Sequence, residues 1–376
     1  MMRLAGLFQG DSLKMRALRS TGFAALSFGG GQALRLVTNL VLTRLLFPEA
    51  FGMMALVMVV LQGLTMFSDV GISPAIMQSR RGDDPDFLNT AWTIQVGRGV
   101  LLWLAACGLA WPMAQFYREP DLAVFLPVAA TTLIVSGFNP TRLDTANRHL
   151  RLGRVAGLEL LGQAAGSVFA IGLAILLGSI WALVVSNIAA AIVFLTMATL
   201  VLPGERNRLR WDPVAARELI NFGKWVFLST VAGFLFSQGD KIVLGRYLPL
   251  DLFGIYNIGY FLASFPFMLG RMVTRKVLIP IYREKPPHES AENFTALRRM
   301  RVLVSLALLS ALLGVAFAGV WLVDLLYDDR YAMAGAIVVA LAAMQVPQIV
   351  GLTYDHAAMA AGDSRQFFVV AATRAV

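Results

Sequence analysis

The chain has 376 residues, of which 57% are hydrophobic and only 15% are charged, and its mean hydropathy is +0.67. Because soluble domains carry about a quarter charged residues, this composition excludes an ordinary soluble protein and indicates a chain that lies mostly in lipid. A single cysteine, Cys107, and three widely separated histidines exclude a disulfide framework and argue against a metal site or a cofactor. The net charge of +9 does not predict nucleic-acid binding, because the basic residues lie in short gaps between apolar segments.

The apolar segments predict ten complete membrane crossings, since a helix needs about 20 mostly apolar residues to cross the bilayer core. Residues 1–19 are expected to form a cytoplasmic amphipathic lead-in, with a disordered tail as the open alternative. The crossings are predicted at residues 20–46, 50–78, 88–115, 121–145, 155–178, 180–203, 218–246, 251–282, 300–326 and 331–361. An eleventh begins near Gln366 and is cut off by the end of the chain.

These crossings predict two helical lobes. The first lobe, residues 20–203, holds six helices, and a cytoplasmic linker follows at residues 204–217. The second lobe, residues 218–376, holds four helices and the start of a fifth. The outward connections are too short to house a catalytic domain, so an enzyme is not expected.

Orientation is predicted from lysine and arginine, which cytoplasmic connections retain. These residues gather in the N-terminal tail and in every second connection. The opposite connections hold only Arg44, Arg118, Arg246 and Arg330. The N-terminus is therefore expected in the cytoplasm.

One short sequence occurs twice. The copy at residues 42–52 reads LTRLLFPEAFG, and the copy at residues 244–254 reads LGRYLPLDLFG, with Arg, an acidic residue, Phe and Gly at matching positions. Both copies lie at the outer end of an odd-numbered crossing, so both halves enter the membrane in the same direction. This indicates a parallel repeat, whose lobes can rock around a central cavity. Chance similarity between two helix joints is the open alternative.

Charged residues inside the predicted crossings are costly and usually face a cavity. The basic candidates for binding substrate there are Arg35, Arg98, Lys224, Lys241 and Arg271. The acidic candidates for ion coupling are Asp69, Asp240 and Asp355. Basic groups outnumber acidic ones, which favours an anionic ligand. Asp69, Arg142 and Asp144 lie near a predicted inner boundary, where anchoring at the interface is an equally open interpretation.

The run Gly29–Gly31 falls inside the first predicted crossing. It is expected to break or thin that helix, consistent with a hinge or a close helix contact. A phosphate-binding loop is not expected, because no Gly-Lys-Ser or Gly-Lys-Thr follows. Motifs of metalloproteases and serine hydrolases are also missing from the sequence.

The chain resembles bacterial polysaccharide transporters in two regions. The first contains FGGGQALRLVTNLVLTRLLFPEAFGMMALV followed by FSDVGISPAIMQS. The second, QGDKIVLGRYLPLDLFGIYNIGYFLASFP, resembles the seventh-to-eighth helix signature of the same group. These transporters are lipid-linked oligosaccharide flippases of O-antigen lipopolysaccharide, exopolysaccharide and teichoic acid pathways, within the multidrug/oligosaccharidyl-lipid/polysaccharide exporter superfamily.

The resemblance implies an all-α polytopic membrane protein of the bacterial inner membrane, with two helical lobes around a V-shaped cavity. It implies transfer of undecaprenyl-diphosphate-linked oligosaccharide from the inner to the outer leaflet, in contact with membrane lipids and with polysaccharide polymerase or export machinery. It implies cavity cations in helices one, seven and eight, where this chain has Arg35, Lys224, Lys241 and Arg271. Their guanidinium and ammonium groups suit a diphosphate.

One departure separates the chain from this family, which has at least twelve helices. The second lobe is therefore expected to be truncated, and whether the chain is a fragment or a short form stays open. The alternative functions are a multidrug exporter of the sister family, whose cavity is expected to be acidic, and a membrane-embedded glycan polymerase, ligase or glycosyltransferase. A scaffold that assembles a synthesis complex is the remaining alternative.

Overall fold

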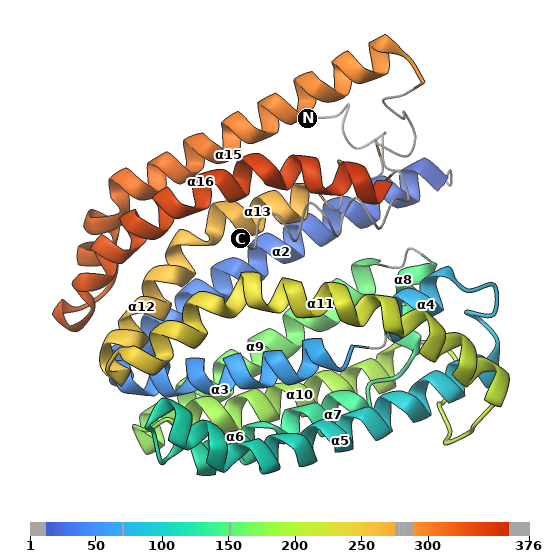
Figure 1. The fold of residues 1–376 in the computed structure, drawn as a ribbon, viewed down its shortest axis with the longest axis horizontal. Helices are drawn as coiled ribbons and strands as arrows, with labels where there is room; N and C mark the ends of the chain where they lie inside the picture. The colour runs from blue at the N-terminus through green and yellow to red at the C-terminus, as the bar shows by residue number, and fades with distance from the viewer. Residues whose placement is uncertain are drawn as a thin grey trace. The chain divides into compact units, whose positions relative to one another are not determined.

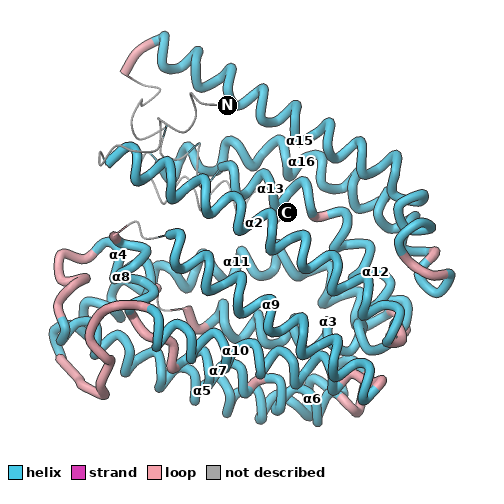
Figure 2. The backbone as a smooth tube through the Cα atoms, turned by 180° about the vertical axis from the view of Figure 1, so that it is seen from behind, coloured by secondary structure: helices cyan, strands magenta, loops and turns pink. Residues whose placement is uncertain are grey.

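The computed structural model of the chain describes residues 13–69, 71–149, 152–274, 278, 281 and 289–360. Side chains are described in these ranges except at residues 13–25, 152, 221–229, 231, 232, 236 and 353–360. All regular structure in the described part of the chain is helical (Figure 2). Contacts divide the chain into two compact units. The first unit is Met1–Leu46 with Met53–Tyr247, and the second is Phe47–Gly52 with Leu248–Val376.

The first unit is a bundle of long helices with short helices between them (Figure 1). Helix α2 packs against α9, and α9 packs against α10, while α5 contacts α6, α7 and α11. The helices are α2 (Leu13–Leu45), α3 (Pro48–Phe67), α4 (Ile72–Gln78), α5 (Pro85–Tyr117), α6 (Leu122–Ala129), α7 (Thr131–Gly137), α8 (Arg142–Arg148), α9 (Leu152–Leu177), α10 (Trp181–Val201) and α11 (Pro213–Tyr247). The first five residues of α3 belong to the second unit.

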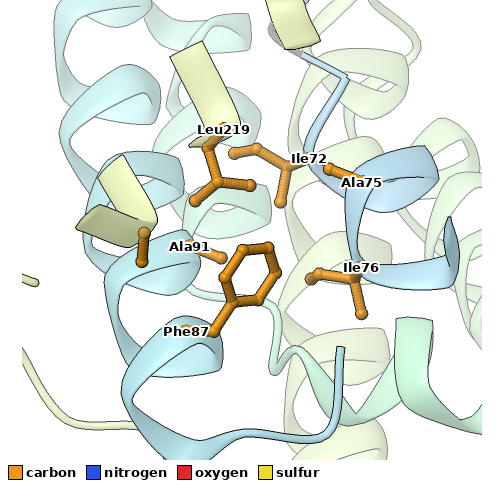
Figure 3. Packing of buried hydrophobic residues seen from close by; sticks show 7 residues of the cluster. Ile72, Ala75, Ile76, Phe87, Ala91 and Leu219 are labelled. Carbon is orange, nitrogen blue, oxygen red and sulfur yellow. The ribbon is translucent and has the colours of Figure 1, made fainter. Parts of the chain in front are cut away.

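Helices α4, α5 and α11 meet in a buried apolar cluster (Figure 3). The ring of Phe87 lies between Ala91 and Ile76, and Leu219 of α11 packs above it. Burying a ring of this size contributes about 1.5–3 kcal/mol. The cluster therefore fixes the start of α5 and the segment that joins it to α4.

The second unit contains α12 (Leu250–Ala263), α13 (Phe265–Val273), α15 (Ala291–Leu326), the 3₁₀ helix η3 (Asp329–Tyr331) and α16 (Met333–Ala360). Helix α15 packs along α16, and α12 and α13 both contact this pair. Leu308 and Leu312 of α15 meet Ala342 and Ile349 of α16 in the buried core of the unit.

Six helices of the described residues are long and apolar enough to cross a membrane, and two bent pairs raise the number to eight. One bent pair joins Leu122–Gly137 to α8 at 60°, and the other joins α12 to α13 at 43°. The predicted first and seventh crossings form α2 and α11, which are outside this set. The eleventh crossing lies outside the described residues, as do residues 1–12 of the lead-in.

Three predicted crossings are interrupted, one of them, 251–282, at the bend between α12 and α13. The predicted crossing 50–78 divides into α3 and α4, so Asp69 lies in a connection and not inside a helix as expected. The carboxylate of Asp69 accepts a hydrogen bond from the backbone N–H of Gly71 at 2.9 Å, and Gly71 adopts a φ of 62° that favours glycine. The predicted crossing 121–145 divides into α6, α7 and α8, with Asn139 and Pro140 in the second break.

The glycine run does not break its helix, contrary to the prediction. Helix α2 continues from Leu13 to Leu45 through Gly29–Gly31. The expected close contact is present, because the amide of Gln163 on α9 donates a hydrogen bond to the carbonyl of Gly31 at 2.6 Å. The small residues therefore let α9 approach the backbone of α2 without interrupting it.

The repeated sequence forms the same local structure twice. Arg44 and Arg246 each occupy the last turn of a helix, α2 and α11 respectively. A short connection follows, and Glu49 and Asp251 then occupy the first turns of α3 and α12. An arginine at a helix C-terminus and a carboxylate at a helix N-terminus both complement the helix dipole. The sequence repeat is therefore a repeat of local structure.

Candidate functional site

A cavity of about 320 Å³ lies inside the first unit and contains two of the predicted site residues. Arg98 of α5 and Asp69 of the α3–α4 connection both line it, and Asp144 of α8 lines it as well. The break between α3 and α4 and the break between α7 and α8 both open onto this cavity. Irregular backbone at membrane depth is tolerated where it lines such a cavity, because polar partners are within reach.

Arg98 is fixed by the end of α3. Its Nη2 donates a hydrogen bond to the carbonyl of Thr65 at 2.7 Å, and its Nε donates to the hydroxyl of Ser68 at 3.0 Å. The hydroxyl of Ser68 in turn donates to the carbonyl of Leu64 at 2.8 Å, and Thr230 of α11 donates to the carbonyl of Met66 at 2.9 Å. Three carbonyls that a helix end leaves without partners are thereby satisfied by side chains.

One nitrogen of Arg98 remains available to a ligand. Its Nη1 makes no hydrogen bond to any residue that the structure describes. The carboxylate of Asp69 attracts the guanidinium electrostatically. The site therefore holds a positioned cation with an open donor, which suits an oxygen-rich ligand.

The end of α7 supplies the opposite wall of the cavity. The side-chain amide of Gln95 donates to the carbonyls of Gly137 and Asn139, both at 3.1 Å. The side-chain oxygen of Asn139 is buried without a hydrogen-bond partner in the described structure. The carboxylate of Asp144 also lines the cavity, as does Ser73. Amide and carboxylate acceptors of this kind suit the hydroxyl groups of a sugar.

The other predicted cations are not brought into this cavity. Arg35 is exposed on α2, and Arg271 is exposed on α13 of the second unit. Lys241 of α11 is half-buried and lies 3.4 Å from the side-chain oxygen of Gln238, next to Asp240 in sequence. The side chains of Lys224 and Asp355 lie outside the described residues. The assignment of these groups to substrate or ion binding stays a prediction.

Sequence reasoning missed the role of the two breaks. It left Asp144 open between a cavity and an interface and did not single out Asn139, because hydropathy averages over about 20 residues and hides a short interruption. Local signals were present, since Asp69 precedes a glycine by two residues and Asn139 precedes a proline. These signals predict helix breaks, where backbone N–H and C=O groups are free to face a cavity.

Residues 41–335 match the family described as "Polysaccharide biosynthesis protein". The chain belongs to this family. The succinoglycan biosynthesis transport protein ExoT of Rhizobium meliloti (strain 1021) is 24% identical to it over 304 residues, covering 81% of this chain and 60% of ExoT. The lipopolysaccharide biosynthesis protein WzxC of Escherichia coli (strain K12) is 22% identical over 325 residues, covering 85% of this chain and 65% of WzxC. The chain thus spans less than two thirds of the length of these relatives.

Solved structures show the fold. The lipid II flippase MurJ, in an inward closed conformation, matches 93% of this chain and 78% of its own chain with a TM-score of 0.72 and 10% identity. An inward-facing multidrug resistance MATE family transporter of the MOP superfamily matches 94% of this chain and 88% of its own, with a TM-score of 0.63 and 12% identity. Identities this low establish the fold alone.

These findings confirm the resemblance and the fold class predicted from the sequence. The chain is an all-helical, multi-span membrane protein of a polysaccharide biosynthesis family, with the fold of the multidrug/oligosaccharidyl-lipid/polysaccharide exporter (MOP) superfamily. Relatives whose names state an activity are a transport protein, a transporter and a flippase, in agreement with the prediction that the chain is not an enzyme.

Proposed function

We propose that the chain acts as a flippase that moves polyprenyl-diphosphate-linked oligosaccharide from the inner to the outer leaflet for surface polysaccharide biosynthesis. The observation that carries this proposal is the family match over residues 41–335 on a fold shared with a lipid II flippase. A flippase must bind a headgroup that is both anionic and rich in hydroxyl groups. The cavity around Arg98 offers a cation, amides and carboxylates together.

The connections between helices favour transport over polymerisation or ligation. In the part of the chain that the structure describes, the longest connection is the segment between α10 and α11, residues 202–212. A membrane-embedded polymerase or ligase is expected to carry a larger extramembrane segment for its catalytic residues. The described part of this chain is helix with short joints, as a transporter requires.

The proposed mechanism is alternating access in the bacterial inner membrane, with the N-terminus in the cytoplasm. Arg98 binds the diphosphate or an adjacent sugar, and the other predicted cations, Arg35, Lys224, Lys241 and Arg271, complete the path of the headgroup. Asp69, Asp240 and Asp355 are the proposed groups for coupling to an ion gradient. Partners are membrane lipids and the polysaccharide polymerase or export machinery.

The first experiment tests on which leaflet lipid-linked glycan accumulates. The gene is deleted, and diphosphate-linked oligosaccharide is assigned to the inner or outer leaflet by its accessibility to a membrane-impermeant glycosidase. Accumulation on the inner leaflet, relieved by expressing the chain, is the expected result. Accumulation on the outer leaflet would place the defect after flipping and contradict the proposal.

The second experiment tests Arg98. Arg98→Ala is expected to abolish export, whereas Arg98→Lys keeps the charge, loses the paired donors and retains partial export. Arg44→Ala, at an exposed arginine in the last turn of α2, is the matched control and should export normally. Expression and thermal stability are measured for all three variants, because Arg98 also contacts the end of α3. Normal export by a stable Arg98→Ala protein would remove this residue from the substrate path.

A further inference from the structure

A second cavity of about 320 Å³ lies in the first unit and is not part of the site around Arg98. It is lined by three elements, α8, the start of α9 and the segment that follows α10, together with the start of α5 and the connection before it. Three arginines from these three places line it, namely Arg142, Arg154 and Arg206. Such convergence of basic groups from separate elements is typical of a site for an anion.

Arg142 is held in place yet incompletely paired. Its Nη1 donates a hydrogen bond to the carbonyl of Leu202 at 2.6 Å. Its Nε is buried and has no hydrogen-bond partner in the described structure. A Cβ atom added to Gly204 would lie 2.9 Å from the Cδ of Arg142, so the glycine leaves room for this side chain. The Nη2 of Arg142 makes no hydrogen bond to any residue that the structure describes and is not buried in this way, so it can donate to an anion in the cavity.

The other two arginines add positive charge that the protein does not neutralise. Arg154 and Arg206 are exposed and make no ion pair with any residue that the structure describes. Arg206 also repels Arg142 electrostatically. Three like charges are brought together here, which favours binding of a counter-ion.

Two carboxylates line the same cavity, and neither offsets the three arginines. Asp83 is engaged by its own basic partners, Arg148 at 3.2 Å and the ring of His149 at 2.8 Å. Glu205 is exposed and forms no ion pair within the described residues. It lies beside Arg206 in sequence and weakens the attraction of the site for an anion.

The depth of the cavity indicates where the anion comes from. The apolar span of α9 begins at Gly153, next to Arg154, and the span of α10 ends at Val201, next to Leu202. The ends of membrane spans lie at the level of lipid headgroups. Trp211, a residue type enriched at that level, is exposed a few residues beyond the cavity.

We propose that this cavity binds the phosphate group of an anionic membrane lipid, as a site separate from the path of the transported glycan. Basic pockets between transmembrane helices are established binding places for such headgroups. The bound phosphate accepts hydrogen bonds from Arg142 and is surrounded by the charges of Arg154 and Arg206. The lipid joins α8, α9 and the segment after α10 at the membrane surface.

The test measures lipid binding directly and does not depend on transport. The purified full chain in a neutral detergent is titrated with dioleoylphosphatidylglycerol, and bound lipid is counted by native mass spectrometry. The double variant Arg154→Gln/Arg206→Gln should bind about tenfold more weakly, since two charges near the membrane surface are removed. Arg208→Gln, an exposed arginine on the same segment but outside the cavity lining, is the matched control and should bind normally. Glu205→Gln should bind the lipid more tightly, because it removes a negative charge from the cavity.

Inorganic phosphate is titrated in parallel at constant ionic strength to separate the two sources of a phosphate group. Displacement of the lipid only at high phosphate concentration agrees with a headgroup site. Saturable binding of inorganic phosphate with no binding of phosphatidylglycerol would overturn the assignment to a lipid. Equal lipid binding by the double variant and by Arg208→Gln would overturn the site itself, because both variants replace only exposed side chains and are expected to fold.

Discussion

Gly52 and Gly254, which occupy the same position in the two copies of the repeat, contact each other reciprocally. A Cβ atom on Gly52 would overlap the carbonyl oxygen of Leu250, and one on Gly254 would overlap the carbonyl oxygen of Pro48. Pro48 and Leu250 are the first residues of α3 and α12 and are themselves matching positions. The starts of the two helices therefore cross with each glycine against the other's backbone. Duplication accounts for this symmetry more directly than chance similarity does.

Replacing either glycine by alanine should push the two helix starts apart. Gly52→Ala and Gly254→Ala are each expected to destabilise the protein by about 1–3 kcal/mol, because backbone cannot yield as a flexible side chain can. Gly97→Ala, on α5 with open space around it, is the control and should be neutral or stabilising. Thermal unfolding in detergent measures all three.

The double variant Gly52→Ala/Gly254→Ala gives a further measurement of the same contact. Once one methyl group has pushed the two helix starts apart, the second should destabilise the protein little further. The two losses of stability should therefore not add. Strictly additive losses would show that the two glycines act independently.

The glycine run in α2 provides a matched pair of substitutions. Around Gly29 there is open space for a Cβ atom, so Gly29→Ala should stabilise the helix by up to about 1 kcal/mol. A Cβ atom on Gly31 would lie 2.9 Å from the side-chain oxygen of Gln163, so Gly31→Ala should disturb the hydrogen bond between α9 and α2. The thermal midpoint should rise for the first variant and stay level or fall for the second. Equal increases for both would contradict the close packing at Gly31.

Arg148 is expected to be a strong determinant of stability. Its Nη1 donates to the carbonyls of Ile76, Met77 and Ser79 at the end of α4, at distances of 2.7–3.1 Å. Arg148→Ala should cost about 2–4 kcal/mol, since it leaves these carbonyls without their charged donor. Arg148→Lys should recover only part of the loss. Arg80→Ala, an exposed neighbour that makes no ion pair among the described residues, is the control for lost charge.

Acid should weaken the junction before α11. Hydrogen bonds from Arg81 hold the pKa of Asp84 and of Asp212 below the usual range, and the Arg81 Nη2 lies 2.7 Å and 3.0 Å from the two carboxylates. A lowered folded-state pKa means that the stabilisation is present above the unfolded pKa of about 3.9 and is lost as the pH falls through the folded value.

The measurement is the thermal midpoint between pH 7 and pH 3. Asp84→Asn/Asp212→Asn should be less stable than the unaltered chain at pH 7 and should converge with it at the acid end. Asp121 is an exposed aspartate without an ion pair in the described structure. The thermal midpoint of Asp121→Asn should therefore change with pH in the same way as that of the unaltered chain. A difference in thermal midpoint between the double variant and the unaltered chain that stays constant down to pH 3 would contradict the pairing with Arg81.

The helical class and most of the crossings follow from the sequence. Lipid tolerates only structures whose backbone hydrogen bonds are made internally, and long apolar segments are easily recognised as such helices. Arg98 and Asp69, which the sequence suggests as charged residues facing a cavity, both line the cavity of the first unit, and their roles stay predictions. The partners of Arg98 are not predictable, since Arg98 lies on α5 while Thr65 and Ser68 lie at the end of α3. The continuity of α2 through three glycines is also unpredictable, because it depends on the packing of α9.

The bend after α7 has a consequence for both cavities. Helix α8 has only seven residues, yet Asp144 lines the cavity around Arg98 while Arg142 lines the cavity that also contains Arg154 and Arg206. A helix this short moves as one piece, so a tilt that suits an occupant on one side reshapes the wall on the other. Occupancy of the two cavities is then energetically linked, and such linkage acts equally in both directions. Under the two proposals above, the composition of the surrounding membrane would tune how tightly the chain binds the glycan headgroup.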